Sequence, residues 1–197
     1  MRLVTLPGVF TPISDSRLLA DCLRAEVHPG ARVADLCTGS GLLAVVAACQ
    51  GAAATAVDVS RRAVITARLN ARLNGVRVRA LRGDLLAPLD GERFDVIVSN
   101  PPYVPATTGG RAWAGGRDGR ALIDRICDEA PGRLRPGGAL LLVHSSVNGE
   151  AETLGRLAAR GLRAEIVARR RGPLGPLMRE RVSVRDEELL VVRGRLP

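Results

Sequence analysis

The fold of this chain is decided by residues 94–103, which read Phe-Asp-Val-Ile-Val-Ser-Asn-Pro-Pro-Tyr. The apolar, β-branched centre of this stretch, residues 96–98, is typical of a buried parallel strand. The two prolines remove two backbone donors and fix φ, so neither a strand nor a helix continues through them. The chain must therefore leave the sheet as a stiff loop at the carboxyl end of a strand, where open α/β sheets bind their ligands.

The loop at residues 100–103 offers groups that suit a planar NH₂ group. The side-chain oxygen of Asn100 and the carbonyl of Pro101 can each accept an N–H, and Tyr103 supplies an aromatic face. A side-chain amide or the exocyclic amine of a base has this shape. We therefore predict Asn100, Pro101, Pro102 and Tyr103 as catalytic residues, with an ordinary proline-rich turn as the alternative.

Four motifs together carry a family resemblance. Asn-Pro-Pro-Tyr, with Asp-Leu-Cys-Thr-Gly-Ser-Gly at residues 35–41, resembles the S-adenosylmethionine-dependent amino-group methyltransferases. Residues 113–120 (Trp-Ala-Gly-Gly-Arg-Asp-Gly-Arg) and 9–16 (Val-Phe-Thr-Pro-Ile-Ser-Asp-Ser) are similar to the HemK group, especially its short branch without an N-terminal helical domain. The resemblance runs from about residue 9 to residue 143. It implies S-adenosyl-L-methionine as cofactor and an α/β, Rossmann-like class I methyltransferase fold. That fold is a seven-stranded, mostly parallel sheet with helices on both faces and an antiparallel closing strand.

The length and composition allow one compact domain over residues 1–197, because 46% of the residues are hydrophobic. No apolar run approaches a membrane span, and the first eight residues are too short and broken for a signal peptide. The four cysteines lack CxxC spacing and only two histidines are present, which argues against a zinc site. These features predict a cytoplasmic protein that binds no metal and no membrane.

The net charge of +9 is the difference between 29 basic residues, all of them arginine, and 20 acidic residues. The choice of arginine over lysine reflects either selection for bidentate phosphate contacts or a genome-wide compositional bias, and the abundance of Ala, Gly and Arg throughout the chain favours the bias. The positive sign still favours an acidic or nucleic-acid-bearing partner. Aromatic residues make up 2% of the chain, which leaves few stacking platforms for single-stranded nucleic acid.

The first predicted cofactor residues surround a glycine turn. Residues 31–36 form a predicted strand, residues 37–41 the turn, and residues 42–50 a helix. Gly39 and Gly41 let the backbone approach a ligand at the amino terminus of that helix. The resemblance implies that Asp35 receives the ammonium of the cofactor. The family has glycine where this chain has Cys37, whose side chain either crowds the amino-acid end of the cofactor or fills space.

Asp58 ends a second predicted strand, residues 55–58, and the offset 58 − 35 = 23 fits one βαβ unit. A carboxylate there can accept both ribose hydroxyls, as it also does for NAD, or it can cap the helix predicted over residues 60–74. The glycine turn does not match GxGxxG, which argues against a dehydrogenase.

Four more cofactor residues are implied by the resemblance. Asp84 matches the position that accepts from the adenine amine, with the Leu85 backbone beside it; a surface turn is the alternative. Ser16 lies in the opening segment, residues 1–30, which closes over the cofactor in the family. Asp15 or Ser16 also fits as the N-cap of the first helix. Asn100 is predicted to contact the cofactor as well as the substrate.

The second half of the chain is predicted to continue the same alternation. Residues 105–119 form a substrate-facing loop, and a helix then runs to residue 134 with residues 135–138 as its stop. The remaining elements are a strand at 139–143, a helix at 150–160 and an antiparallel pair at 164–168 and 189–192, joined by a basic hairpin loop at 169–185. That loop either docks on an acidic partner such as RNA or is a solvated charge run. His144 is either a general base or a histidine whose hydrogen bonds are satisfied in the core or behind the site.

Residues 76–80 form a predicted edge strand that carries Arg77 and Arg79. Eukaryotic members of the short branch bind a small zinc-containing activator at this edge. Because arginines protect the edge from pairing, we predict no obligatory activator subunit here.

The resemblance favours methylation of a glutamine side-chain amide in a protein, as the HemK group does on translation release factors; lysine remains open. The alternatives are an exocyclic base amine of RNA or DNA and an amine of a small molecule or peptide. A protein that only binds the cofactor is a further alternative, which the intact residues 100–103 argue against.

Overall fold

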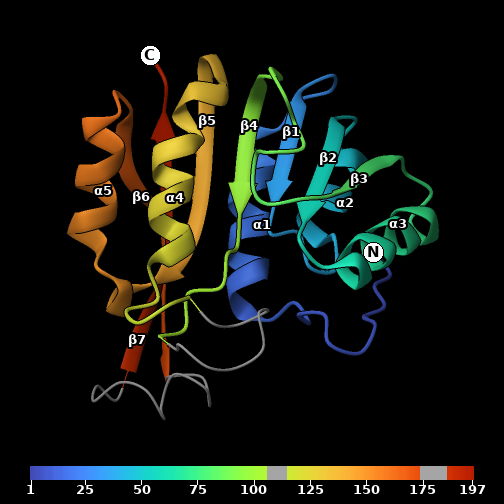
Figure 1. Cartoon of the computed structure of the whole chain (residues 1–197), viewed down its shortest axis with the longest axis horizontal. Helices are drawn as coiled ribbons and strands as arrows, with labels where there is room; N and C mark the ends of the chain where they lie inside the picture. Colours follow the sequence, from blue (N-terminus) through green and yellow to red (C-terminus); the bar gives the residue numbers. More distant parts are fainter. Residues whose placement is uncertain (106–114, 174–185) are drawn as a thin grey trace.

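The computed structural model describes residues 1–105, 115–173 and 186–197 (Figure 1). Helices and strands alternate over most of the chain, as the sequence predicts. Their order is α1 (Ser14–Glu26), β1 (Arg32–Leu36), α2 (Leu42–Cys49), β2 (Ala53–Asp58), α3 (Arg61–Leu73), β3 (Val78–Arg82), β4 (Phe94–Ser99), α4 (Ala121–Glu129), η1 (Pro131–Arg133), β5 (Leu134–Ser145), η2 (Ser146–Asn148), α5 (Glu150–Ala159), β6 (Arg163–Pro173) and β7 (Asp186–Arg195).

The strands form one sheet in the order β3-β2-β1-β4-β5-β7-β6. Strands β1 to β5 pair in parallel, and β7 runs antiparallel to both β5 and β6. This confirms the mostly parallel sheet with an antiparallel closing strand. The strand order reverses between β1 and β4, and ligands of open α/β sheets bind at such a switch point.

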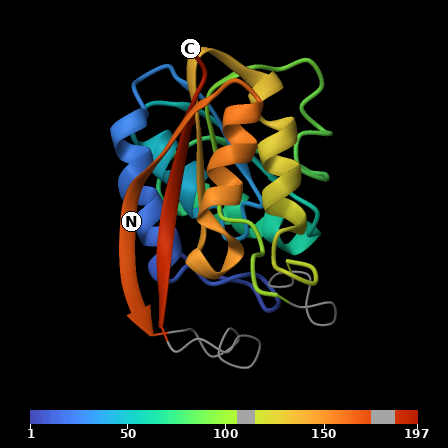
Figure 2. The same cartoon turned by 90° about the vertical axis from the view of Figure 1, so that its left-hand side faces the viewer.

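Helices cover both faces of the sheet, as predicted. On one face, α1, α2 and α3 bury apolar side chains such as Leu19, Leu43 and Val64. On the other face, α4 and α5 bury Ile123 and Leu157. Figure 1 shows α4 and α5 in front of the strands and α1 behind them, and Figure 2 shows the same two layers from the side. Both faces of the central strands are therefore buried, which explains why their sequences are continuous apolar runs.

Helix α3 ends in a Schellman motif, which delays the strand that follows. The N–H of Val76 donates to Ala71 O at 3.0 Å, and Gly75 adopts φ +68°, a conformation that glycine takes without strain. Because Val76 still belongs to the helix cap, β3 begins at Val78 and not at residue 76. The strand lies at the edge of the sheet, as predicted.

Strand β5 begins earlier than the sequence predicts, and α4 ends earlier. Leu134 pairs with Phe94 of β4, and Arg135 Nη1 contacts Asp95 Oδ2 at 3.2 Å. These contacts hold residues 135–138 in the strand, so the predicted helix stop was wrong at this point. Tertiary pairing here overrides the turn preference of a Pro-Gly-Gly sequence.

Strand β6 extends through Pro173, so residues 169–173 of the predicted basic hairpin loop belong to a strand. Arg169 lies between Glu150 and Glu188, at 2.5 and 3.1 Å, which neutralises its charge at the sheet. The remainder of that loop, residues 174–185, lies outside the described residues. Within the described part of the chain, every helix is too short or too polar to cross a membrane.

Candidate functional site

The turn after β1 and the loop after β4 leave the sheet side by side. Leu36 and Ser99, the last residues of the two strands, are register partners. Cys37 and Asn100 therefore begin their loops at the same level of the switch point. We call residues 100–103 the acceptor loop and residues 37–41 the glycine turn.

The first turn of α1 binds the acceptor loop. The Nδ2 of Asn100 donates to Ser16 Oγ at 3.0 Å, and the hydroxyl of Tyr103 donates to Asp15 Oδ2 at 2.9 Å. Asp15 and Ser16 are only 2% and 4% exposed. The N-cap is Ile13, so the prediction that Asp15 or Ser16 caps this helix was wrong. Their side chains are used instead to hold the acceptor loop.

The phenol of Tyr103 stays neutral in this environment. Burial raises its pKa well above the ordinary value, and the neighbouring Asp15 carboxylate raises it further. A neutral phenol remains a hydrogen-bond donor, so the contact with Asp15 persists throughout the neutral pH range. The Tyr103 side chain is therefore held in one position in the acceptor loop by its hydrogen bond to Asp15.

Two glycines let the following segment pack directly on the acceptor loop. A Cβ on Gly119 would lie 2.2 Å from Tyr103 O, and one on Gly115 would lie 2.8 Å from Pro102 O. The N–H of Gly115 also donates to Val104 O at 2.8 Å. The described end of the predicted substrate-facing segment thus lies against Pro102 and Tyr103. Residues 106–114, which include Trp113, lie outside the described residues.

Asp35 presents a buried oxygen that lacks a partner. Its Oδ2 accepts from Thr38 Oγ1 and, at 3.1 Å, from the N–H of Ala44. Its Oδ1 finds no donor within the described residues, although Asp35 is only 1% exposed. Burial raises the pKa of this carboxyl to about 7. An unsatisfied carboxylate oxygen at the ligand edge of the sheet fits the ammonium group of S-adenosylmethionine.

The glycine turn needs its left-handed conformations. Gly39 and Gly41 have φ of +53° and +82°, and a Cβ on Gly41 would lie 2.7 Å from Ala67 of α3. Cys37 also has a positive φ, +57°, which costs a non-glycine residue roughly 1 kcal/mol. Burial and the carboxylates of Asp58 and Asp35 raise the pKa of the Cys37 thiol, so it stays uncharged. A neutral, half-buried thiol thus stands where the family has glycine.

Asp58 is tied to the glycine turn at the end of β2. Its Oδ2 accepts from the N–H of Gly39 at 2.9 Å, and its Oδ1 accepts from the N–H of Ser60 at 2.8 Å. Burial raises the pKa of its carboxyl. The N-cap side chain of α3 is that of Ser60, which accepts from Ala63 N. Each Asp58 oxygen keeps a lone pair, which suits the two hydroxyls of a ribose.

Asp84 and Leu85 lie on the α4 side of the site. Asp84 contacts Arg125 Nη1 at 3.0 Å with its side chain 54% exposed. Leu85 has φ +44° and is buried. A hollow of about 340 Å³ adjoins this ion pair and is lined by Asp84, Leu86, Ala87, Arg125, Glu129 and Arg133. The contacts of Asp84 thus run to α4, whereas Ser16 and Asp58 contact the acceptor loop and the glycine turn.

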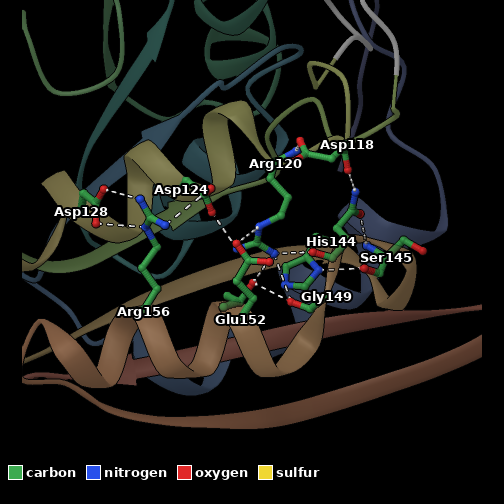
Figure 3. A network of polar contacts seen from close by, with 11 residues as sticks. Asp118, Arg120, Asp124, Asp128, His144, Ser145, Gly149, Glu152 and Arg156 are labelled. Atoms are coloured by element: carbon green, nitrogen blue, oxygen red, sulfur yellow. Dashed lines mark hydrogen bonds and ion pairs between the residues drawn. The ribbon is translucent and has the colours of Figure 1, made fainter.

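His144 lies inside the protein, with no exposed surface. Its Nδ1 lies 2.8 Å from Ser145 O, and its Nε2 is unpaired among the described residues. Burial lowers the pKa of the imidazole, so it is neutral near pH 7. It belongs to a polar network around Arg120, between α4 and α5 (Figure 3). This placement favours a buried histidine behind the site over a general base that meets the substrate.

Sequence reasoning missed three residues that shape the acceptor side. Asp15 holds Tyr103, Asn148 holds the carbonyls of Tyr103 and Asp118, and Arg120 holds the carbonyl of Asn148. Asp15 had a signal, because it lies in one of the family motifs. Arg120 had the same kind of signal, because it ends the motif at residues 113–120, whereas Asn148 had none, because the carbonyls that it holds lie at least 30 residues away.

Comparison with known proteins gives a consistent picture. The sequence profile of the methyltransferase small domain family matches residues 1–171 of this chain. A Methanocaldococcus jannaschii protein described as an N5-glutamine methyltransferase is 36% identical over 186 residues, covering 90% of this chain and 93% of the relative. The Bordetella pertussis release factor glutamine methyltransferase is 40% identical over 163 residues, covering 74% of this chain. The chain spans 60% of the length of that relative.

Solved structures agree with the sequence relatives. The E. cuniculi Mtq2–Trm112 complex, described as responsible for methylation of the eRF1 termination factor, superposes with a TM-score of 0.74 at 27% identity. The match covers 96% of this chain and 99% of that one. The T. thermophilus 16S rRNA N2 G1207 methyltransferase, bound to AdoMet and guanosine, shares the fold with a TM-score of 0.68 at 24% identity, covering 98% of this chain and 46% of that one.

Proposed function

Because this chain belongs to the methyltransferase small domain family, we propose that it transfers a methyl group to the side-chain amide of a glutamine in a protein, such as a translation release factor. The chain is an S-adenosylmethionine-dependent N-methyltransferase. The observation that supports an NH₂ group as the methyl acceptor is the geometry of Asn100, and the relatives favour a glutamine amide. Its Nδ2 is held by Ser16, which leaves Oδ1 as the atom that accepts from a substrate N–H.

The relatives narrow the acceptor class. Their names specify glutamine in release factors and in ribosomal protein uL3. The glutamine side-chain amide is therefore the acceptor group that these names share. We therefore place the amide NH₂, and not one particular protein, at the centre of the proposal.

The cofactor supplies an electrophilic methyl group on a sulfonium sulfur. In this chain, Asp35 Oδ1 would hold its ammonium, and residues 37, 39 and 41 would line its amino-acid end. Asp58 would accept from the ribose, and Asp84 and Leu85 would meet the adenine. Ser16 and Asn100 would close the site from the acceptor side. The unpaired oxygen of buried Asp35 is the strongest support for this arrangement.

An amide nitrogen is a poor nucleophile because its lone pair is delocalised. Asn100 Oδ1 and Pro101 O together can accept both N–H bonds of the substrate amide, which orients the nitrogen lone pair. The same two oxygens would stabilise the positive charge that develops on nitrogen as it is methylated, and the nitrogen would then lose one N–H proton to solvent. Pro101 and Pro102 stiffen the loop, so this geometry exists before the substrate binds. Tyr103, fixed by Asp15, would contact the planar amide.

We further propose that the segment 1–30 covers the cofactor. A Cβ on Gly39 would lie 3.7 Å from Phe10 Cβ, so the segment passes over the glycine turn. We expect removal of residues 1–13 to weaken cofactor binding.

We also propose that the protein is cytoplasmic, because its four cysteines are free thiols.

We propose that no activator subunit is required, although the related Mtq2 structure contains Trm112. The edge strand β3 carries Arg79, whose Nη2 pairs with Glu92 at 2.7 Å, beside exposed Arg77. These charges disfavour pairing of another strand at this edge. Copurification of a stoichiometric small subunit with the protein from its native host would overturn this proposal.

The function is tested with extract from host cells that lack this gene. Purified protein and methyl-labelled S-adenosylmethionine are added, and the labelled material is divided by protease and ribonuclease sensitivity. We expect the label on a glutamine of a protein of release-factor size, located by mass spectrometry. Label that disappears with ribonuclease and maps to a base amine, or that lies on a lysine or a small molecule, would overturn the proposal.

A further inference from the structure

Two buried asparagines each hold two backbone carbonyls, one on each side of the site. Asn70 Nδ2 donates to Val4 O and Ser40 O, both at 2.8 Å. Asn148 Nδ2 donates to Tyr103 O at 2.8 Å and to Asp118 O at 3.2 Å. Asn70 is 0% and Asn148 is 2% exposed. Each amide thus joins two segments that are distant in sequence.

The two carbonyls held by Asn148 mark the two ends of one segment. Tyr103 closes the acceptor loop, and Asp118 precedes α4 at the end of the predicted substrate-facing segment. The contact is tight, because a Cβ on Gly119 would lie 2.3 Å from Asn148 Nδ2. One amide therefore fixes the base of this segment directly against the last residue of the acceptor loop.

Asn148 is itself held in place from several directions. Its Oδ1 accepts from Ser145 N at 3.2 Å, and its carbonyl accepts from Arg120 Nη1. Arg120 reaches from the start of α4 across to Gly149 O at 3.1 Å, with Asp124 and Glu152 around it (Figure 3). The Arg120 side chain is buried and cannot move to solvent. We call Asn148, together with the two carbonyls that it holds, the clamp. Because Asn148 is buried, the clamp is part of the protein interior and not a surface contact.

We propose that Asn148 is a positioning residue for the methyl acceptor and not for the cofactor. This inference rests on the proposed function of the acceptor loop. Asn148 acts through Tyr103 and Asp118, whereas Asn70 acts through Ser40 of the glycine turn. The two asparagines, alike in burial and bonding, therefore serve opposite sides of the same site.

The test compares Asn148→Asp with Asn70→Asp. Each substitution keeps the shape of the side chain. It replaces an NH₂ group that donates to two backbone carbonyls with a carboxylate oxygen that repels both. We expect Asn148→Asp to lower kcat/KM for the acceptor about 10- to 100-fold, with the cofactor Kd within about threefold of wild type. We expect Asn70→Asp to raise the cofactor Kd by more than it changes kcat/KM for the acceptor at saturating cofactor. Asn148→Ala, which adds no charge, gives the same readout if the Asp variant fails to fold.

Amide hydrogen exchange gives a second readout that needs no substrate. Gly115 N donates to Val104 O at 2.8 Å beside the clamp, and Gly41 N donates to Thr38 O at 2.8 Å in the glycine turn. Exchange at Gly115 should accelerate in the Asn148 variants, while exchange at Gly41 should not change. An equal loss of acceptor and cofactor binding, or unchanged exchange at Gly115, would overturn the inference.

Turnover is measured on whichever acceptor the labelling experiment identifies. If that acceptor is not a glutamine, the proposed function fails, but the ratio of the acceptor effect to the cofactor effect still tests Asn148. Gln50, whose Nε2 donates to Arg24 O at 3.0 Å at the end of α2 away from the glycine turn, provides the neutral control. Gln50→Ala should leave both constants near wild type.

Discussion

The hydroxyl of Tyr103 donates a 2.9 Å hydrogen bond to Oδ2 of Asp15, which lies 88 residues earlier in the chain. Beside it, Asn100 donates to Ser16. The first turn of α1 therefore fixes two of the four acceptor-loop residues before any ligand binds. A loop held in this way needs little further ordering when a substrate amide arrives, which favours rate as well as affinity.

This contact predicts an unusual titration of Tyr103, which is the only tyrosine in the chain. The phenolate absorbance should appear at a higher pH than for an exposed tyrosine, because burial and Asp15 raise the pKa. In Asp15→Asn the charge is removed, so the pKa should fall while burial keeps it above the ordinary value. Asp21→Asn, on the exposed side of the same helix, is the control. Identical titration curves for Asp15→Asn and wild type would contradict the assigned contact.

The role of Asn100 predicts a separation of binding from turnover. Asn100→Ala removes the oxygen that accepts from the substrate amide, so transfer should fall by about 100-fold or more. The cofactor Kd should change much less, because the Asp35 and Asp58 contacts remain. Single-turnover rates and calorimetric titration with S-adenosylmethionine measure the two effects. Near wild-type turnover in Asn100→Ala would show that the acceptor is held by other groups.

The switch point of the sheet was predictable from residues 35–58 and 94–103. Buried parallel strands are apolar runs, and the polar residues that follow them mark the ligand edge. The positive φ of Gly39, Gly41 and Gly75 also follows from local sequence, because glycine populates such conformations freely. These are local properties, so one sequence was enough to predict them.

The contacts around the acceptor loop were not predictable in the same way. A side chain such as Asn148 looks like an ordinary polar residue after a strand, and only the fold brings it to Tyr103. The start of β5 shows the same limit, because Pro136 and Gly137 favour a turn until Leu134 pairs with Phe94. Asp84 remains a prediction as the adenine acceptor, since its observed partner is Arg125.

The glycine turn predicts a difference between two glycines with the same backbone conformation. Gly41 and Gly30 both have φ +82°, but a Cβ on Gly41 would lie 2.7 Å from Ala67, whereas one on Gly30 would meet no atom within 4 Å. Both Ala variants should lose about 1 kcal/mol for the positive φ. Gly41→Ala should lose roughly 1–3 kcal/mol more, because α2 and α3 must separate. Denaturant unfolding measures both, and equal losses would contradict the close packing.

Asp35 predicts that stability and cofactor affinity respond oppositely to pH. Its pKa is about 7 in the folded protein and about 4 in the unfolded chain, so between these values the folded state binds the extra proton. The free energy of unfolding of the cofactor-free protein should therefore fall as the pH rises from 4 to 7, by at most on the order of 4 kcal/mol. The ammonium of the cofactor prefers the ionised carboxylate, so affinity should rise over the upper part of the same range.

Asp35→Asn should remove the contribution of this residue to the pH dependence of stability and to the pH dependence of cofactor affinity. The amide keeps an oxygen for Thr38 Oγ1 and Ala44 N, so the variant should fold. Without cofactor it should lose less stability than wild type between pH 5 and pH 8, because the buried carboxyl at position 35 no longer has to ionise. Its affinity for S-adenosylmethionine should be at least about tenfold weaker at pH 8, because the charge partner of the ammonium is gone. Denaturant unfolding and calorimetry at several pH values measure both, with Asp90→Asn as an exposed control. If the stability of wild type and Asp35→Asn changed in parallel with pH, Asp35 would be ionised throughout, and its unpaired oxygen would not be the group that selects the cofactor.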